Sequence, residues 1–161
     1  MGIMAETLII REAAPHEAKC LSSLAIRSKA YWGYSDEFMR ACSEELEVSS
    51  ADIESSDYHY VVANIGDEII GFYALEGLSG IEIELGALFV DPSHIGSGVG
   101  KSLMTRAKHH ASSLGAHKLF IQGDPHALEF YQAVGGVPTG HKESDSIPGR
   151  FLPTFSISLV R

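Results

Sequence analysis

The chain has 161 residues, of which 45% are hydrophobic and 20% charged, and its formal net charge is -9 at pH 7. This length and apolar content predict one globular domain, residues 1–161, with a sizeable core. The negative charge argues against nucleic acid as a partner. No apolar run approaches the ~20 residues that cross a bilayer, so no membrane partner is expected.

Cysteine usage and the N-terminal segment predict a cytoplasmic protein. Cys20 and Cys42 have no further ligands at metal-binding spacing, so no metal site is expected, and two isolated thiols suit a reducing compartment. Residues 1–11 carry no basic residue ahead of their short apolar run, which does not fit a secretory signal.

Periodicity and turn signals divide the first half of the chain into strands and helices. Strands are expected over residues 7–11, 58–65 and 68–76, the last two joined by a hairpin turn at Gly66-Asp67. Helices are expected from Ala14-Pro15 to about residue 27, from residue 36 to about residue 46 after an N-cap at Ser35, and as a short capped turn after Ser49.

The second half alternates strands and helices. Strands are expected over residues 81–90, 118–121, 137–141 and 154–160, and helices over residues 99–114 and 126–134. A polar, turn-rich loop is expected over residues 142–153. This order predicts an α/β (α+β) fold, in which helices flank a mixed, mostly antiparallel sheet.

The most informative stretch connects the strand 81–90 to the helix that follows it. Pro92 ends the strand, because proline has no N–H for a sheet ladder, and Gly96, Gly98 and Gly100 follow at alternate positions. The first N–H groups of a helix lack partners, and the helix dipole adds partial positive charge there. Glycine lets the backbone adopt positive φ and lets a phosphate approach without meeting a Cβ atom. The stretch therefore predicts a phosphate-binding loop.

Two common phosphate-binding motifs do not fit these glycines. The triphosphate loop matches at Gly100-Lys101-Ser102, but it needs a glycine where Ile95 stands, and Asp124 does not directly follow an apolar strand as a magnesium ligand would. The dinucleotide fingerprint G-x-G-x-x-G has Lys101 where its third glycine belongs. A nucleotide hydrolase stays an alternative because of Gly100-Lys101-Ser102.

Residues 90–100, V-D-P-S-H-I-G-S-G-V-G, resemble motif A of the GCN5-related N-acetyltransferase (GNAT) family, in which a strand ending V-x-P precedes Q/R-x-x-G-x-G/A. Ile95 departs from this pattern, since the family prefers Gln or Arg there. The resemblance implies that acetyl-coenzyme A (acetyl-CoA) is the co-substrate and that the loop's backbone amides bind its pyrophosphate. The cofactor-binding residues that it implies are Leu88, Phe89, Val90, Ile95, Gly96, Ser97, Gly98, Val99, Gly100, Lys101, Asp124 and Tyr131.

Residues 124–136, D-P-H-A-L-E-F-Y-Q-A-V-G-G, resemble the family's motif B, N-x-x-A-x-x-F-Y-x-x-x-G-F. Asp124 replaces the asparagine, and Gly136 replaces the usual aromatic residue. Because two motifs occur in the family's order, the resemblance covers nearly the whole chain. It implies the GNAT fold, with six to seven strands in a mostly antiparallel sheet flanked by helices.

Amine acetylation needs a base, because a free alkyl amine is mostly protonated at neutral pH. Glu84 is the candidate, since a carboxylate on an apolar strand needs a reason and the family often places its base here; a surface or ion-paired carboxylate is the alternative. Strand alternation predicts one face shared by Glu82, Glu84, Gly86, Leu88 and Val90. The resemblance implies that Tyr131 donates a proton to the departing thiolate; a core tyrosine is the alternative.

The acceptor site is predicted from an aromatic stretch and one arginine. Trp32 and Tyr34 fall where the family's first two helices overlie the acceptor cleft, and their rings either line that cleft or fasten two helices together. Arg150, in the loop 142–153, can pair with an acceptor carboxylate. The acidic chain and the aromatic residues suit a cationic amine as well. The expected acceptor is therefore a primary amine of a small molecule or a peptide.

Together these features predict an acetyl-CoA-dependent N-acetyltransferase that moves an acetyl group to an amine by direct attack in a ternary complex. A non-catalytic module that binds or senses CoA is the alternative from another class, because Ile95 and Gly86 depart from the family's pattern. A homodimer is a further expectation, since many proteins of the family are dimers.

Overall fold

The structure, a computed structural model, describes residues 7–160. Within this range the strands are β1 (Leu8–Glu12), β2 (Tyr58–Ile65), β3 (Glu68–Glu76), β4 (Glu82–Val90), β5 (Lys118–Gln122), β6 (Val137–Glu143) and β7 (Phe151–Ser158). The α-helices are α1 (Ala18–Ala30), α2 (Asp36–Leu46), α3 (Ser50–Glu54), α4 (Val99–Ser113) and α5 (Leu128–Ala133). Short 3₁₀ turns occupy Pro15–Glu17, Pro92–His94 and Pro125–Ala127.

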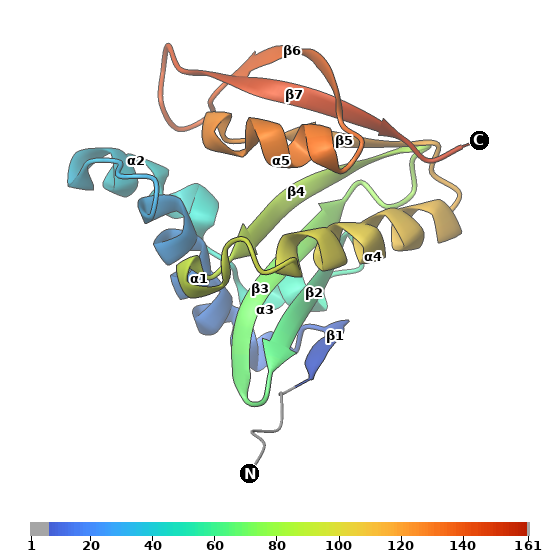
Figure 1. The fold of residues 1–161 in the computed structure, drawn as a ribbon, viewed down its shortest axis with the longest axis horizontal. Coiled ribbons are helices and arrows are strands. Elements are labelled where there is room, and N and C mark those ends of the chain that lie inside the picture. The colour runs from blue at the N-terminus through green and yellow to red at the C-terminus, as the bar shows by residue number, and fades with distance from the viewer. Residues whose placement is uncertain (1–6, 161) are drawn as a thin grey trace.

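The seven strands of residues 7–160 form one sheet in the order β1-β2-β3-β4-β5-β7-β6. Every neighbouring pair is antiparallel except β4 and β5, which run parallel. Figure 1 shows the sheet extending from β1 at its lower edge to β6 and β7 at its upper edge. The predicted fold, a mixed and mostly antiparallel sheet of six to seven strands flanked by helices, is confirmed.

Each face of the sheet is covered by helices that bury their own apolar cluster. α4 and α5 pack on one face, where Leu103 and Met104 of α4 are fully buried. α1 and α2 pack on the other face, where Leu21, Leu24 and Phe72 are fully buried. Burial of this apolar surface is the main force that holds the helices to the sheet. Among the described helices, none has the length and hydropathy that crossing a bilayer requires.

β4 and β5 pair over only part of their length. Their register runs from Glu82 opposite Lys118 to Leu85 opposite Ile121, and β4 then continues to Val90 with β3 alone beside it in the described structure. The edge of residues 86–90 that faces β5 therefore carries backbone N–H and C=O groups without a strand partner. This splayed edge is the feature of the fold that matters most for a ligand.

A β-bulge at Gly86 interrupts the pairing of β3 with β4. Leu85 stands opposite Leu75 and Ala87 opposite Ala74, so Gly86 has no partner in β3. One extra residue in a strand shifts its period-two alternation, and every side chain beyond it changes face.

The predicted common face of β4 is therefore wrong. Leu85 before the bulge and Leu88 after it both pack on the face covered by α4, whereas Ala87 and Phe89 pack on the face covered by α1 and α2. Glu84 alternates with Leu85 and so lies on the α1 and α2 face, away from Leu88. Strand alternation alone could not reveal this, because the bulge depends on the pairing with β3.

Most boundaries predicted from caps and turns are confirmed. Ser35 caps α2, and its Oγ accepts a hydrogen bond from the backbone N–H of Phe38 at 3.1 Å. The Gly66-Asp67 turn joins β2 and β3 at the predicted residues. α1 ends later than predicted, at Ala30, because no residue that breaks a helix occurs before Gly33, whose φ is 88°.

β7 begins at Phe151 rather than at the predicted residue 154, and β6 extends to Glu143, so the expected loop 142–153 is too long. Pro153 lies near the start of β7, just before the residue that pairs with Gln122 at the end of β5, so its missing N–H affects only the end of that ladder. The Pro153 carbonyl oxygen accepts a hydrogen bond from the Gly123 N–H at 2.9 Å.

Replacing Leu103 by alanine is expected to lower the free energy of unfolding by about 2–5 kcal/mol. Leu103 is fully buried, and its Cδ1 lies 3.0 Å from the position that a Cβ atom on Gly71 would take, so truncation opens a cavity between α4 and β3. Thr105→Ala, on the exposed side of the same helix, is the control and should change the value by less than about 0.5 kcal/mol. Urea denaturation measures both; equal losses would contradict the expectation.

Candidate active site

The glycine-rich loop after β4 has the backbone geometry of an anion site. Gly96 and Gly98 have φ angles of 85° and 92°, in the left-handed region that favours glycine. Gly98 is also the N-cap residue of α4. No described atom lies within 4 Å of the positions that Cβ atoms on these residues would take. The space in front of the loop is therefore open to a ligand.

Several backbone N–H groups at the start of α4 have no partner. The N–H of Ser102 donates to the Gly98 carbonyl at 3.0 Å. Ahead of it, the N–H groups of Gly98, Val99, Gly100 and Lys101 donate to no acceptor in residues 7–160. These groups and the helix dipole together create partial positive charge at a place where a phosphate can bind.

Gly100 serves this region differently from Gly96 and Gly98. It is helical, without positive φ, and a Cβ atom on it would lie 3.0 Å from the ring of Phe130 in α5. Of the three glycines, Gly96 and Gly98 adopt positive φ, and Gly100 does not. At that position, glycine instead allows α4 to pack closely against α5.

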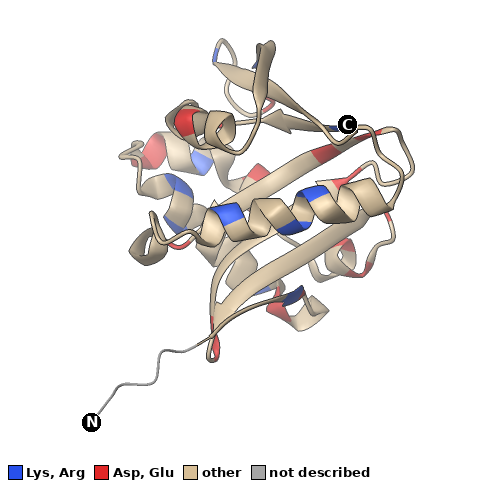
Figure 2. Ribbon diagram, turned by 45° about the vertical axis from the view of Figure 1, so that its right-hand side comes forward, with Lys and Arg blue, Asp and Glu red and all other residues tan. Residues whose placement is uncertain are grey.

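Lys101 supplies positive charge beside the loop. Its side chain is exposed at the start of α4 and lines the neighbouring cleft. Figure 2 shows further basic residues along α4. Lys108, in the second half of this helix, instead donates from Nζ to the carbonyl oxygen of Val134 at 2.6 Å. Lys101 is therefore the lysine of α4 that is placed to meet a bound phosphate.

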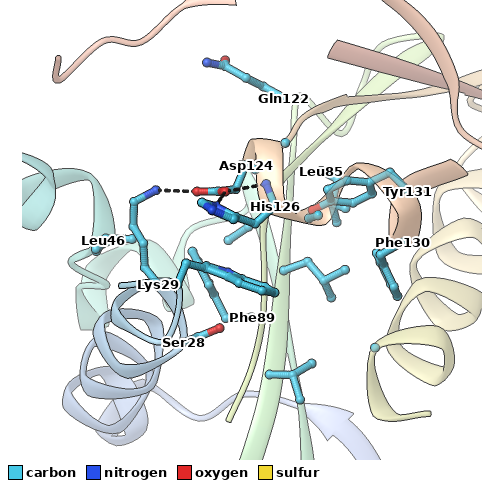
Figure 3. Close-up of a pocket in the computed structure, with 18 of the residues that line it drawn as sticks. Ser28, Lys29, Leu46, Leu85, Phe89, Gln122, Asp124, His126, Phe130 and Tyr131 are labelled. Carbon is cyan, nitrogen blue, oxygen red and sulfur yellow. Dashed lines mark hydrogen bonds and ion pairs between the residues drawn. The ribbon is translucent and has the colours of Figure 1, made fainter. Parts of the chain in front are cut away.

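The loop opens into a cleft of about 800 Å³. Its walls come from the end of α1, the second half of β4, the start of α4, and the segment that leads from β5 into α5. Figure 3 shows Lys29, Asp124 and His126 on one side of the cleft and Phe130 and Tyr131 on the other. The splayed edge of β4 and the unpaired N–H groups of α4 thus border the same space, which is large enough for a small-molecule ligand.

Tyr131 of α5 is held in the cleft wall by close packing. A Cβ atom on Gly123 would lie 2.7 Å from its ring, and the Phe155 ring lies 5.4 Å away between centroids. Burial, followed by the negative charge of Asp124, raises the pKa of the Tyr131 phenol above its usual range. The phenol therefore keeps its proton at neutral pH and can act as a hydrogen-bond donor.

Asp124, just after β5, joins segments from distant parts of the chain. Its carboxylate accepts hydrogen bonds from the Tyr34 hydroxyl at 2.8 Å and from the backbone N–H of His126 at 2.9 Å. Lys29 Nζ lies 3.4 Å and Arg150 Nη2 3.5 Å from the same carboxylate. Burial by itself would raise the pKa of Asp124, but these hydrogen bonds and Lys29 outweigh it and lower the pKa to about 2.

The three residues predicted to bind the acceptor come together near Asp124. Trp32 lines the cleft and stacks on His126, with ring centroids 5.0 Å apart and planes 7° from parallel. Trp32 therefore lies in the cleft wall, and its contact with an acceptor stays a prediction. The Arg150 guanidinium donates to the Tyr34 hydroxyl at 2.8 Å. Because Tyr34 and Arg150 bind each other and Asp124, their contact with an acceptor stays a prediction.

The candidate base Glu84 is half-buried and lines the cleft. Two further polar residues of this cleft, Glu76 and Lys29, are not among the predicted site residues. Glu76 stands directly opposite Glu84 in the β3–β4 register. Only the register of two strands joined by a short turn could have indicated Glu76, and no local signal marks Lys29.

The remaining residues predicted to bind the cofactor differ in whether their side chains or only their backbone can reach a ligand. The three predicted residues of β4, Leu88, Phe89 and Val90, all line the cleft. Ile95 also lines it and is exposed. The Val99 side chain is only 4% exposed and points into the core, so only its backbone is available to a ligand. The Ser97 hydroxyl donates to the carbonyl oxygen of His94 and closes the loop.

Replacing Asp124 by asparagine should reduce the acid sensitivity of folding. The pKa of this carboxyl falls from 3.8 in the unfolded chain to about 2 in the folded protein. The carboxylate therefore stabilises the fold fully when the pH is above 3.8. That contribution to stability is lost as the pH falls through the pKa of the folded state, about 2. In Asp124→Asn the free energy of unfolding should drop by roughly 2 kcal/mol at pH 7 and depend less on pH between about 2 and 4.

Urea unfolding across that pH range measures the effect of Asp124→Asn. Asp67→Asn, in the exposed β2–β3 turn, is the control and should follow the wild-type profile. A profile for Asp124→Asn that runs parallel to the wild type would contradict the assigned hydrogen-bond network.

Comparison with known sequences gives one family and one curated relative. The model of the acetyltransferase (GNAT) domain matches residues 18–146. Peptidyl-lysine N-acetyltransferase YjaB of Escherichia coli (strain K12) is 32% identical over 101 residues, which is 63% of this chain and 63% of that protein. The match therefore spans less than two thirds of the relative's length.

Comparison with solved structures gives the same fold over almost the whole chain. A GCN5-related N-acetyltransferase from Rhodopseudomonas palustris has a TM-score of 0.78 at 23% identity, covering 98% of this chain and 99% of that one. The PaiA N-acetyltransferase of Thermoplasma acidophilum, solved in complex with coenzyme A, has a TM-score of 0.77 at 19% identity, covering 94% and 99%. With the family model matching most of its length, the chain belongs to the GNAT acetyltransferase family.

Proposed function

We propose that this protein is an acetyl-CoA-dependent N-acetyltransferase that acetylates a primary amine of a small molecule or a peptide by direct attack in a ternary complex. The observation that carries this function is that two features border one cleft: the unpaired N–H groups at the start of α4 and the splayed edge of β4. Membership of the GNAT family supports it, since acetyl-CoA is the co-substrate of these enzymes.

Acetyl-CoA fits this cleft because the cleft offers hydrogen-bond partners for both its pyrophosphate and its pantetheine arm. The N–H groups of Gly98, Val99 and Gly100, with the Lys101 ammonium, suit the pyrophosphate. The backbone edge of residues 86–90 suits the amide groups of the pantetheine arm, which can pair with it as an added strand does. Bound there, acetyl-CoA supplies an activated acetyl thioester.

Residues at the inner end of the cleft supply the remaining chemistry. Glu84 takes a proton from the acceptor, because an alkyl amine is mostly protonated at neutral pH. A backbone N–H of Leu88 or Val90 polarises the carbonyl under attack, in the manner of an oxyanion hole. Tyr131 donates a proton toward the leaving thiolate, a role supported by its protonated state and its position in the cleft wall.

The proposed acceptor is a cationic amine. Glu45, Glu76, Glu84 and Asp145 line the cleft, and none of them forms an ion pair with another described residue. Unpaired carboxylates attract an ammonium group. The E. coli relative is named a peptidyl-lysine N-acetyltransferase, which makes a lysine side chain in a peptide one candidate acceptor.

A cytoplasmic location and a homodimer belong to the same proposal. Cys20 and Cys42 are free thiols, which suits a reducing compartment. Size-exclusion chromatography with light scattering tests the dimer directly.

Ligand stabilisation and thiol release together test the function. CoA, ATP with Mg²⁺, and NAD are compared by thermal shift, and thiol release from acetyl-CoA is then measured with a lysine peptide blocked at its α-amine, spermidine and free amino acids. Stabilisation by CoA and thiol release with one of these amines are expected. Stabilisation by CoA without release from any amine favours the non-catalytic module, and stabilisation by ATP alone favours a nucleotide hydrolase.

Replacing Gly98 by valine should weaken CoA binding about tenfold or more. A β-branched residue avoids a φ of 92°, and its side chain would enter the open space in front of the unpaired N–H groups. Isothermal titration calorimetry with CoA measures the affinity.

Gly115→Val is the matched control for Gly98→Val. Gly115 stands just beyond the other end of α4, has a φ of 90°, and has no described atom within 4 Å of its Cβ position. Both variants should lose similar thermal stability through backbone strain, but only Gly98→Val should lose CoA affinity. Wild-type affinity in Gly98→Val would remove the phosphate loop from the proposal.

Replacing Tyr131 by phenylalanine should lower kcat about tenfold or more with little change in CoA affinity. The phenyl ring keeps its packing against Gly123 and Phe155, so mainly the hydroxyl is lost. Tyr73→Phe is the control, because Tyr73 is also buried and its hydroxyl has no partner among the described atoms. Steady-state thiol release measures both variants; a wild-type rate in Tyr131→Phe would exclude the proton-donor role.

A further inference from the structure

Glu76 and Glu84 form a carboxyl pair at the inner end of the cleft. They stand directly opposite one another where β3 ends and β4 begins, and both line the cleft. Directly opposed residues of an antiparallel pair project from the same face, with Cβ atoms roughly 5 Å apart. Glu84 lies on the face covered by α1 and α2, so Glu76 lies there too.

The bulge at Gly86 makes room for the Glu76 carboxyl. A Cβ atom on Gly86 would lie 2.6 Å from Glu76 Oε2 and 3.1 Å from its carboxyl carbon. The end of the Glu76 side chain therefore lies over the Gly86 backbone, in space that the side chain of any other residue would enter. Gly86 is also the first residue of the splayed edge of β4. Glu76 thus reaches the point where the sheet opens toward the proposed co-substrate.

The carboxyl pair separates the cleft from a second, smaller cavity. This cavity has a volume of about 420 Å³ and is lined by Asp57, Tyr58, Gly77, Glu82 and Phe120 as well as by the pair itself. Glu76 and Glu84 line both spaces. A proton bound by the pair can therefore be exchanged on the side away from the acceptor.

The surroundings of the pair do not neutralise it. In residues 7–160, no Lys, Arg or His forms an ion pair with either carboxylate. The charge of Lys142 in β6 acts on Glu76 from farther away. The other charged or titratable groups that line the two spaces are Lys29, Glu45, His94, Lys101, Asp124, His126, Tyr131, Asp145, Asp57, Tyr58 and Glu82.

Burial, the hydrogen bond with Glu84 and the negative charge of Glu84 together raise the pKa of Glu76 to about 7. One proton held between two carboxyl groups this close relieves the repulsion between them. A base that binds its proton near neutral pH is also better matched to an ammonium group than an ordinary carboxylate is.

We propose that Glu76 is a catalytic residue and that Glu76 and Glu84 act together as the base that deprotonates the acceptor. The inference rests on the proposed acetyl transfer and names its proton acceptor. In this step one N–H bond of the acceptor ammonium breaks, and its electron pair stays on nitrogen. The proton forms an O–H bond with one carboxylate, and the other carboxylate accepts a hydrogen bond from it. The pair then releases the proton to solvent through the smaller cavity.

A ¹³C NMR titration of the glutamate carboxyl carbons tests the shared proton without any acceptor or co-substrate. The wild type should show one carboxyl with a midpoint near pH 7, as expected for Glu76. Glu84→Gln should lower that midpoint by about one pH unit or more, because it removes the neighbouring charge, and Glu76→Gln should abolish the transition. A wild-type protein with no glutamate carboxyl titrating above about pH 6 would overturn the inference, whereas the proposed acetyl transfer would still stand.

The pH dependence of thiol release tests the catalytic role. With a lysine peptide or spermidine, whichever is acetylated faster, Glu76→Gln should lower kcat/KM about tenfold or more and move its acid limb to lower pH. Glu68→Gln, at the exposed start of the same strand, should match the wild type. An acid limb at the same pH in Glu76→Gln and the wild type would overturn the inference, because a purely structural role does not move it.

Gly86→Ala tests the geometry with both carboxyl groups present. The new methyl group displaces the flexible end of Glu76 rather than backbone atoms, so the variant should fold. Moving Glu76 away from Glu84 should lower the NMR midpoint in the same direction as Glu84→Gln. A midpoint that stays at the wild-type value would overturn the assignment of Gly86 as the residue that makes room for Glu76.

Discussion

The separation of β4 from β5 is the constraint on which the rest of the site depends. Parallel pairing up to Leu85 and Ile121 joins the two parts of the sheet, and the divergence beyond it leaves one edge of β4 without a strand partner in residues 7–160. Backbone N–H and C=O groups need partners, so such an edge favours water or a ligand. The cleft beside it also receives the start of α4, which brings a second set of unpaired N–H groups to the same space.

Two glycines, which lack a Cβ atom, leave room for the side chains that carry the proposed chemistry. A Cβ on Gly86 would lie 2.6 Å from the Glu76 carboxyl, and one on Gly123 would lie 2.7 Å from the Tyr131 ring. Backbone approaches this close are possible only at glycine. The proposed base and the proposed proton donor therefore each depend on a glycine in or beside the sheet, at positions where a larger residue would push the functional side chain away.

Charge is distributed along the cleft in a way that suits two different ligands. Lys101 and the start of α4 make one end positive, where an anionic co-substrate is proposed to bind. Asp124 is already balanced by Lys29 and Arg150. Glu45, Asp145 and the Glu76–Glu84 pair form no ion pair within residues 7–160 and leave the proposed acceptor region negative. A chain of net charge -9 can therefore hold a polyanion and attract a cation within one cleft.

Local signals in the sequence determined the strands, most helix ends and the glycine-rich turn before α4, because caps, tight turns and positive φ depend on a few neighbouring residues. They placed Ser35 as a cap and Gly98 at the head of α4. Only the tertiary structure decided the face of Glu84 and its pairing with Glu76, since a bulge exists only relative to a partner strand. It also decided that Gly100 packs against α5, because that contact joins segments that approach each other only after folding.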